Sequence, residues 1–113
     1  MNCVFCRIAS GEIKTDLVHA DDEIVAFRDL NPQAPTHLLV IPRRHVATTN
    51  DLSPEDAPLV GRLALVARDI ARRLGFADAG YRLVLNCNAD GGQSVLHVHM
   101  HLLAGRQMAW PPG

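Results

Sequence analysis

The clearest pattern in the chain is a stripe of apolar residues with helical spacing. Its positions recur every three or four residues: Leu59, Leu63, Val66, Ile70 and Leu74. Ser53 is a suitable N-cap residue, Pro54 suits the first helical position, and Gly75 is a residue type common just beyond a helix end. The pattern therefore predicts one long amphipathic helix between Ser53 and Gly75, with its arginines on a solvated face.

Shorter apolar runs, separated by turn-forming residues, predict strands. These runs span residues 17–19, 24–29, 37–41, 81–87 and 95–103. The run 37–41 is apolar after its first residue, which is typical of a strand buried on both faces. A short helix is predicted over residues 4–10. Antiparallel hairpins with one long helix and a short N-terminal helix indicate an α+β fold, and 113 residues are the length of a single domain spanning 1–113.

The last predicted strand carries three histidines that alternate with apolar residues. Successive side chains of a strand point to opposite faces, so His97, His99 and His101 fall on one face. The residues between them fall on the other face, where they can pack into a core. A neutral imidazole is a nucleophile, a base and a metal ligand. Three of them in register indicate a functional surface rather than a solvated polar face.

Charge and hydropathy exclude some classes of partner. The formal net charge is -1, which gives no basic field to attract nucleic acid or an anionic membrane. No stretch approaches the ~20 apolar residues that a membrane span needs. The N-terminus also lacks the apolar run of a secretory signal. We therefore expect neither nucleic acid nor a membrane as a partner.

The cysteines indicate a metal site rather than disulfides. Cys3, Cys6 and Cys87 are odd in number and include one close pair, which predicts a reducing, cytoplasmic setting. The pair Cys3 and Cys6 has the spacing of half a zinc site. Its missing ligands would be imidazoles, and His45 and the histidine strand supply them. An unligated pair at a frayed terminus is the alternative.

Other polar groups lie close to the predicted strands. The segment Gly91-Gly92-Gln93-Ser94 can aim backbone N–H groups at an anion, although a simple hairpin turn explains it equally. Asp29 and Asn86 each end a predicted strand, where they either contact a ligand or cap a turn. His37 adjoins a buried strand, so we expect a hydrogen-bonded structural residue there.

Taken together, these segments resemble the histidine triad (HIT) superfamily, and within it the Hint branch. The resemblance rests on Phe27-Arg28-Asp29, Pro32 to His37, Pro42 to His45, Asp90 to Ser94, His97 to Leu103 and Gly105 to Gly113. It implies a HIT-like fold in an intertwined homodimer, whose antiparallel sheets join across the interface. It also implies hydrolysis of purine nucleoside 5′-phosphoramidates, such as AMP joined to an amine, with release of the nucleoside monophosphate.

The resemblance assigns roles to the catalytic residues. His99 is the nucleophile that forms a nucleotidyl-histidine intermediate, and its other ring nitrogen holds a proton against an acceptor such as a backbone carbonyl. Ser94 assists departure of the amine, while Gln93 and His101 stabilise charge on the phosphate oxygens. Asp29 binds the ribose, and apolar residues surround the purine. The implied nucleotide contacts are Phe5, Ile8, Phe27, Asp29, Leu30, Asn86, Gly92, Gln93, Ser94, Val95, His99 and His101.

A zinc site is also implied by the resemblance. Its ligands are Cys3, Cys6, His45 and His97. Two sulfurs and two nitrogens suit tetrahedral Zn²⁺, and with all four positions filled the metal is structural, which excludes His97 from catalysis. In the tail, Ala109 stands where some relatives have a larger polar residue, so the preferred leaving group stays open.

Three other functions stay open at this point. A dinucleoside polyphosphate hydrolase, as in the Fhit branch, would use the same face, but residues 91–94 and the tail favour the Hint branch. A nucleotide-binding interaction module with residual catalysis would not need His99 as a nucleophile. A catalytic metal bound by the three histidines would make turnover sensitive to chelators.

Overall fold

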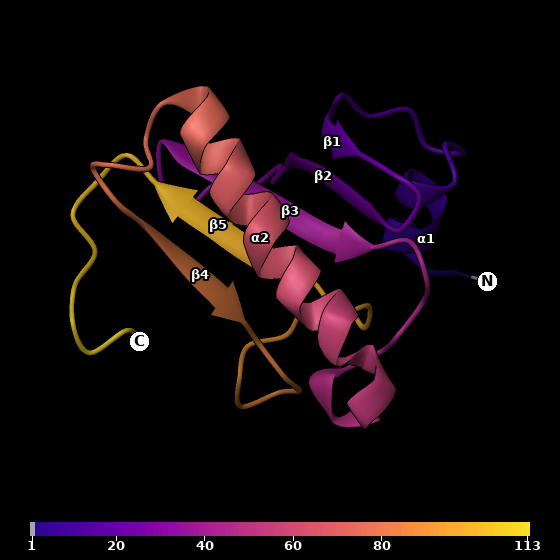
Figure 1. Ribbon diagram of the computed structural model, residues 1–113. Coiled ribbons are helices and arrows are strands. Elements are labelled where there is room, and N and C mark those ends of the chain that lie inside the picture. The colour runs from indigo at the N-terminus through magenta and orange to yellow at the C-terminus, as the bar shows by residue number, and fades with distance from the viewer. Residues whose placement is uncertain (1) are drawn as a thin grey trace.

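The structure, a computed structural model that describes residues 2–113, is built on one antiparallel sheet (Figure 1). Its strands are β1 (Leu17–Ala20), β2 (Ile24–Arg28), β3 (Thr36–Pro42), β4 (Tyr81–Leu85) and β5 (Met100–Ala104). Their order across the sheet is β1-β2-β3-β5-β4, so β1 and β4 are the edge strands. The helices are α1 (Val4–Ala9) and α2 (Ala57–Leu74), and two 3₁₀ turns, η1 (Thr49–Asp51) and η2 (Pro54–Asp56), precede α2. The predicted α+β architecture is confirmed.

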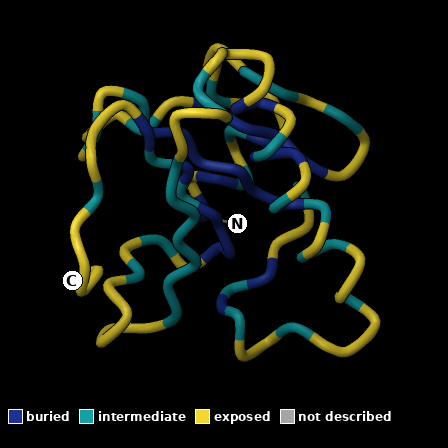
Figure 2. The backbone as a smooth tube through the Cα atoms, turned by 60° about the vertical axis from the view of Figure 1, so that its left-hand side comes forward, coloured by how far each residue is buried: buried dark blue, intermediate teal, exposed yellow. Residues whose placement is uncertain are grey.

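Side chains alternate along each strand, so each face of the sheet contributes to a separate core. A different helix covers each of the two faces. Ala26 and Leu38 belong to the core beneath α2. Phe27 and Leu39 belong to a second core, which includes Phe5 of α1. Buried residues concentrate in the central strands and the exposed ones in the loops (Figure 2). Residues 37–42 are all buried, which confirms the predicted strand with two buried faces.

Helix α2 confirms the predicted long helix, with one difference at its start. Ser53 is the N-cap as predicted, and it forms a capping box with Asp56, in which the Ser53 N–H donates to the Asp56 carboxylate at 2.9 Å. The first turn is the 3₁₀ turn η2, a common geometry at helix ends. Gly75 ends the helix at φ 88°, where its N–H donates to the Ala71 carbonyl at 3.0 Å. Within residues 2–113, no helix is both long and apolar enough to cross a membrane.

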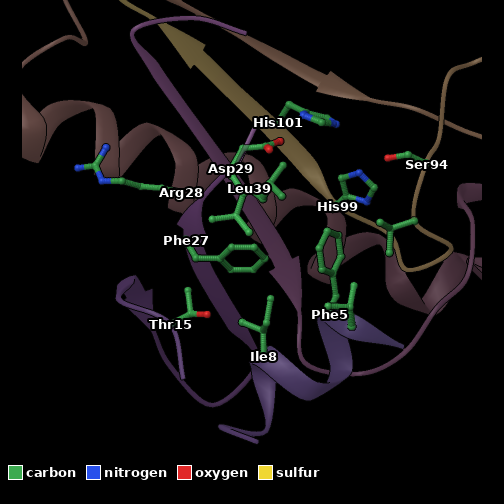
Figure 3. A pocket seen from close by; sticks show the side chains of 13 residues that line it. Phe5, Ile8, Thr15, Phe27, Arg28, Asp29, Leu39, Ser94, His99 and His101 are labelled. Carbon is green, nitrogen blue, oxygen red and sulfur yellow. The ribbon is translucent and has the colours of Figure 1, made fainter. Parts of the chain in front are cut away.

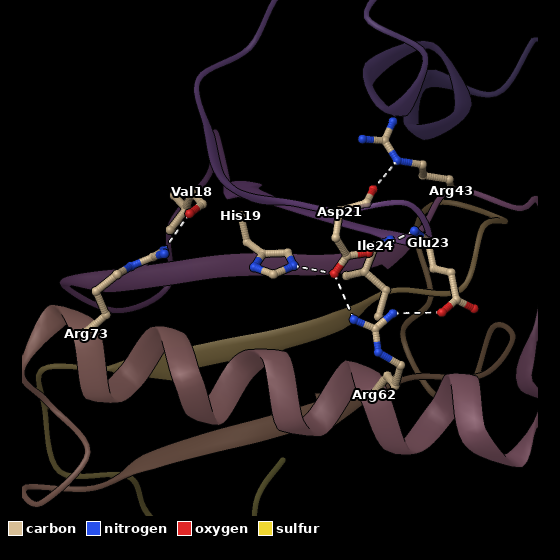
Figure 4. A network of polar contacts seen from close by, with 8 residues as sticks. All are labelled: Val18, His19, Asp21, Glu23, Ile24, Arg43, Arg62 and Arg73. Atoms are coloured by element: carbon tan, nitrogen blue, oxygen red, sulfur yellow. Dashed lines mark hydrogen bonds and ion pairs between the residues drawn. The ribbon is translucent and has the colours of Figure 1, made fainter.

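Two arginines of α2 lie on its solvated face, as the amphipathic pattern predicts, and also bond to groups of the β1–β2 hairpin. Arg62 donates to Asp21 and to Glu23, at 2.8 Å in each case (Figure 4). Arg73 donates to the carbonyl of Val18. These contacts join the β1–β2 hairpin to α2, and helical periodicity alone carries no information about such partners.

The strand that carries the histidines is shorter than predicted. β5 begins at Met100 rather than at Val95, and β4 ends at Leu85 rather than at Cys87. The ladder between β3 and β5 ends at the pair Val40 and Met100. The two predicted boundaries were therefore wrong.

The partner strand explains the late start of β5. Pro42 has no N–H to donate to the segment opposite, and the Val98 N–H donates instead to the Val46 carbonyl at 2.7 Å. The side chains nevertheless alternate as predicted. Val98, Met100 and Leu102 all lie in the core beneath α2. The three histidines therefore point away from α2.

Candidate active site

A cavity of about 270 Å³ opens on the α1 side of the sheet, between α1, β2, β3 and the segment that leads into β5. Most predicted nucleotide contacts line it: Phe5, Ile8, Phe27, Asp29, Leu30, Ser94, Val95, His99 and His101. Asn86, Gly92 and Gln93 lie outside this lining. The fold thus gathers side chains from both ends of the chain at one place.

The cavity has a polar end and an apolar end (Figure 3). Ser94, His99 and His101 lie at one end, and Ile8 and Phe27 lie towards the other. Burial of a flat ring is favourable in an apolar slot, whereas neutral N–H and O–H groups suit an anionic group. The arrangement fits a ligand with an aromatic part and an anionic part.

His99 is held in one tautomer. Its Nδ1 lies 2.7 Å from the backbone carbonyl of His97, and because a carbonyl only accepts, Nδ1 carries the proton. The lone pair is then on Nε2. Phe5 packs edge-on against the ring, with centroids 5.1 Å apart. The predicted proton held on one ring nitrogen by a backbone carbonyl is confirmed.

His101 is held in the opposite tautomer by His37. The Gln33 N–H donates to Nδ1 of His37 at 3.0 Å, so the proton of His37 is on Nε2. That Nε2–H donates to Nδ1 of His101 at 2.8 Å. The proton of His101 is therefore on its own Nε2. His101 can offer this N–H to an anionic group.

Burial keeps both rings neutral. Burial, followed by the nearby imidazoles of His99 and His37, lowers the pKa of His101 to about 4. Burial also lowers the pKa of His37, although the Asp29 carboxylate, 3.4 Å from its Nε2, opposes the shift. Near pH 7 the two rings are donors without charge.

The sequence did not reveal the role of His37. It is buried and hydrogen-bonded, as predicted, but its partner is the candidate catalytic residue His101. The only local signal is the four-residue spacing between Gln33 and His37, and this spacing does not point to residue 101.

The loop before the histidines is braced by Gln93. Its Nε2 donates to the Ala47 carbonyl at 2.7 Å, and its Oε1 accepts from the Asn88 N–H at 2.9 Å. Gly91 is needed nearby, because a Cβ there would lie 2.5 Å from the Cys87 carbonyl oxygen. The side-chain amide of Gln93 is thus engaged within the protein, where it positions the loop.

Four side chains converge at the N-terminal end of α1. Nδ1 of His97 lies 3.3 Å from Cys3 Sγ, 3.5 Å from Cys6 Sγ and 3.3 Å from Nδ1 of His45. Cys6 Sγ also lies 3.3 Å from Nδ1 of His45. A tetrahedral zinc ion, with bonds of ~2.0–2.1 Å to nitrogen and ~2.3 Å to sulfur, spaces its ligand atoms by about 3.3–3.8 Å. The cluster has zinc-like spacing, and it is the predicted set of four residues.

The protonation of His97 also fits a metal. Its Nε2 lies 2.8 Å from the Pro42 carbonyl, so the ring proton is on Nε2. Burial lowers the pKa of His97 and so keeps the ring neutral. Its Nδ1 lone pair therefore faces two sulfurs and a nitrogen, a donor set that zinc prefers.

The geometry argues against a metal bound by all three histidines. Among the described residues, potential metal ligands gather in two groups: Cys3, Cys6, His45 and His97, and Asp29, His37 and His101. In the second group, ring nitrogens of His37 and His101 are 2.8 Å apart, closer than the ~3.3 Å of two nitrogens on one tetrahedral zinc. That pair is a hydrogen bond, and His99 belongs to neither group.

Similar proteins connect this site to a family. The family profile described as "Scavenger mRNA decapping enzyme C-term binding" matches residues 2–110. A HIT family hydrolase from Legionella pneumophila Philadelphia 1 has a structure that superposes with a TM-score of 0.96, at 54% identity over 99% of this chain and 100% of that one. The chain belongs to the histidine triad superfamily.

Other histidine triad proteins agree with this membership. The purine nucleoside phosphoramidase of Escherichia coli strain K12 is 50% identical over 105 residues, which are 93% of this chain and 88% of that protein. A histidine triad protein from Clostridium difficile is 43% identical, with a TM-score of 0.94 over 96% of this chain and 95% of that one. The predicted family and HIT-like fold are confirmed.

Proposed function

We propose that this histidine triad protein is an enzyme that hydrolyses purine nucleoside 5′-phosphoramidates and releases the nucleoside monophosphate. The observation that carries the proposal is the tautomer of His99, whose proton lies between Nδ1 and the His97 carbonyl at 2.7 Å and whose Nε2 is left to attack. The name of the 50% identical Escherichia coli relative supports this substrate class.

The nucleotide binds with its phosphorus beside His99 and its base at the apolar end of the cavity. The Asp29 carboxylate accepts hydrogen bonds from the ribose hydroxyls. Phe5 and Phe27, whose ring centroids are 5.5 Å apart, enclose the purine together with Ile8. Leu30 lines the same cavity and is fully exposed, at 101%, so a bound base reduces its contact with water.

The reaction has two halves. In the first, the Nε2 lone pair of His99 attacks the α-phosphorus, and the P–N bond to the amine breaks. The departing nitrogen takes a proton from the Ser94 hydroxyl, which regains one from solvent. In the second, water attacks the phosphorus, the bond to Nε2 breaks, and one proton returns to solvent. Nε2–H of His101 and the backbone N–H groups of Ser94 and Val95, in the loop that Gln93 positions, stabilise the phosphate oxygens, with Asn86 on the phosphate side.

The test is steady-state hydrolysis of adenosine 5′-phosphoramidate by the wild type, His99→Ala and Ser94→Ala, with intact mass after a brief pulse of substrate. We expect turnover and a mass increase of one nucleotidyl group in the wild type, and neither in His99→Ala. His19→Ala, which changes a histidine outside the cavity lining, is the control. A folded wild type that turns over diadenosine polyphosphate but no phosphoramidate would overturn the proposal.

We also propose that Cys3, Cys6, His45 and His97 hold a structural Zn²⁺. The ligand spacing of 3.3–3.5 Å and the orientation of the His97 lone pair support it. With four protein ligands the ion has no open position, so it stabilises the fold rather than taking part in the reaction. Thiolate ligands require reduced cysteines, which agrees with the predicted cytoplasmic setting.

We further propose that the protein is a homodimer joined through β4. β4 is an edge strand, and an unpaired edge favours pairing with another chain. Trp110, in the segment after β5, is 83% exposed, so within one chain this large apolar ring stays in water. A second copy of the chain would pair the edge and bury the ring.

A further inference from the structure

A second cavity lies next to the apolar end of the nucleotide cavity. It has a volume of about 530 Å³ and is lined by Ile8 together with residues of the segment 11–17. Ile8 and Thr15 line both cavities. We call the second cavity the distal groove. Because two side chains are common to both linings, the distal groove directly adjoins the nucleotide cavity.

The chain around α1 explains why the distal groove exists. Gly11 has φ 84° and donates its N–H to the Ile8 carbonyl at 3.1 Å, which ends α1. The Ile13 N–H then donates to the Arg7 carbonyl at 3.0 Å and folds the segment back along the helix. The segment therefore runs beside the nucleotide cavity, which Thr15 lines, until β1 begins at Leu17.

The proposed binding mode aims one edge of the purine at this groove. In Figure 3, Thr15 lies at the opposite end of the cavity from Ser94 and His101. With the phosphorus at His99 and the ribose at Asp29, the purine edge farthest from the ribose points towards Thr15. That edge carries the exocyclic group at C6.

The groove has an amphipathic lining. Ile8, Ile13 and Leu17 supply apolar surface, and Lys14 and Asp16 supply one charge of each sign. Among the described residues, the side chains of Lys14, Thr15 and Asp16 have no hydrogen-bond or ion-pair partner within the protein. A ligand group can therefore contact them without breaking an internal interaction.

We propose that the distal groove is a subsite for a substituent on the C6 edge of the purine, so that the substrate class includes phosphoramidates of N6-alkylated adenosine. This inference rests on the proposed function, since it needs a nucleotide bound with its phosphorus at His99. The alkyl chain packs on Ile8, Ile13 and Leu17, and a polar end group of the chain reaches Lys14 or Asp16. The reaction at phosphorus is unchanged, because the substituent lies at the other end of the cavity.

The experiment compares adenosine 5′-phosphoramidate with its N6-hexyl derivative on the wild type and on Ile13→Trp. Ile13 lines the distal groove and not the nucleotide cavity, so a larger side chain there blocks only the substituent. In the wild type we expect kcat/KM for the two substrates to agree within about threefold. In Ile13→Trp we expect about a tenfold loss for the hexyl substrate alone. Leu74→Trp, at an exposed position of α2, is the matched control.

Calorimetric titration with AMP and N6-hexyl-AMP separates this inference from the proposed function. If neither phosphoramidate is hydrolysed, the proposed function fails. The subsite is still supported in that case if the wild type binds AMP and N6-hexyl-AMP with equal affinity and Ile13→Trp weakens binding of N6-hexyl-AMP alone. If adenosine phosphoramidate is hydrolysed but N6-hexyl-AMP binds the wild type more than tenfold more weakly than AMP, the subsite is wrong. An equal effect of Ile13→Trp on both nucleotides would also overturn it.

Discussion

His37 is hydrogen-bonded at both ring nitrogens, and the two bonds together orient His101. In His37→Phe the donor to Nδ1 of His101 is lost, so His101 can place its proton on Nδ1 instead of Nε2. We expect kcat to fall by about 10- to 100-fold, because a donor to the phosphate is lost. In His37→Gln, whose amide keeps a donor, we expect partial recovery. Nitrogen chemical shifts of the His101 ring report the tautomer, and shifts unchanged in His37→Phe would contradict this role.

The low pKa of His101 predicts that stability falls in mild acid. The ring titrates near pH ~6.5 in the unfolded chain and at a pKa of about 4 in the folded protein. Between these values the unfolded chain binds more protons, so the free energy of unfolding decreases as the pH falls from 6.5 towards 4. The lowered pKa of His37 acts in the same direction.

Urea unfolding at pH 7, 6 and 5 measures this decrease. His101→Gln removes one of the histidines with a lowered pKa, so its free energy of unfolding should depend less on pH than that of the wild type. If the proposed zinc is bound, its release in acid would affect both proteins equally, and the comparison therefore isolates the imidazole. The same decrease in both proteins would show that His101 does not contribute.

At the scale of elements, α1 connects the cluster of Cys3, Cys6, His45 and His97 to the nucleotide cavity. With six residues it is too short to be stable alone. Cys3 caps its first turn, since Cys3 Sγ accepts from the Cys6 N–H at 3.4 Å. Phe5 and Ile8 of the same helix line the cavity. The orientation of the apolar wall therefore depends on how the N-terminal end of α1 is held.

If Cys3, Cys6, His45 and His97 hold zinc as proposed, removal of the metal should loosen this apolar wall. We expect the metal-free protein to bind AMP about tenfold more weakly and to unfold at a lower temperature. Hydrogen exchange should increase in residues 4–10 and not in α2, which has its own core. Calorimetry on metal-free and zinc-reconstituted protein makes the comparison. If metal-free protein binds AMP as tightly as zinc-loaded protein, the coupling through α1 is absent.

At the scale of the whole molecule, the two edge strands predict different responses to substitution. If β4 forms the dimer interface, Val84→Lys buries a lysine charge there and should give a monomer, whereas Leu17→Lys on β1 should not. Light scattering should give twice the chain mass of 12.3 kDa for the wild type and for Leu17→Lys. A monomeric wild type would contradict the dimer.

The sequence by itself determined the elements of this protein and the direction of many side chains, because both follow from local periodicity. The stripe from Leu59 to Leu74 is enough to predict α2, and alternation is enough to place Val98 and Met100 in the core. The ordered motifs were enough to identify the family. The family resemblance in turn predicted the candidate metal ligands Cys3, Cys6, His45 and His97 and most of the residues that line the nucleotide cavity.

Only the tertiary structure decided which polar groups meet. His37 and His101 are 64 positions apart, and the hydrogen bond between them sets a tautomer that neither local pattern predicts. β5 begins at Met100 because of Pro42 on the neighbouring strand. Arg62 pairs with Asp21, 41 positions away. Partners across a sheet have no fixed spacing in the sequence, so periodicity reveals which way a side chain points but not which group it contacts.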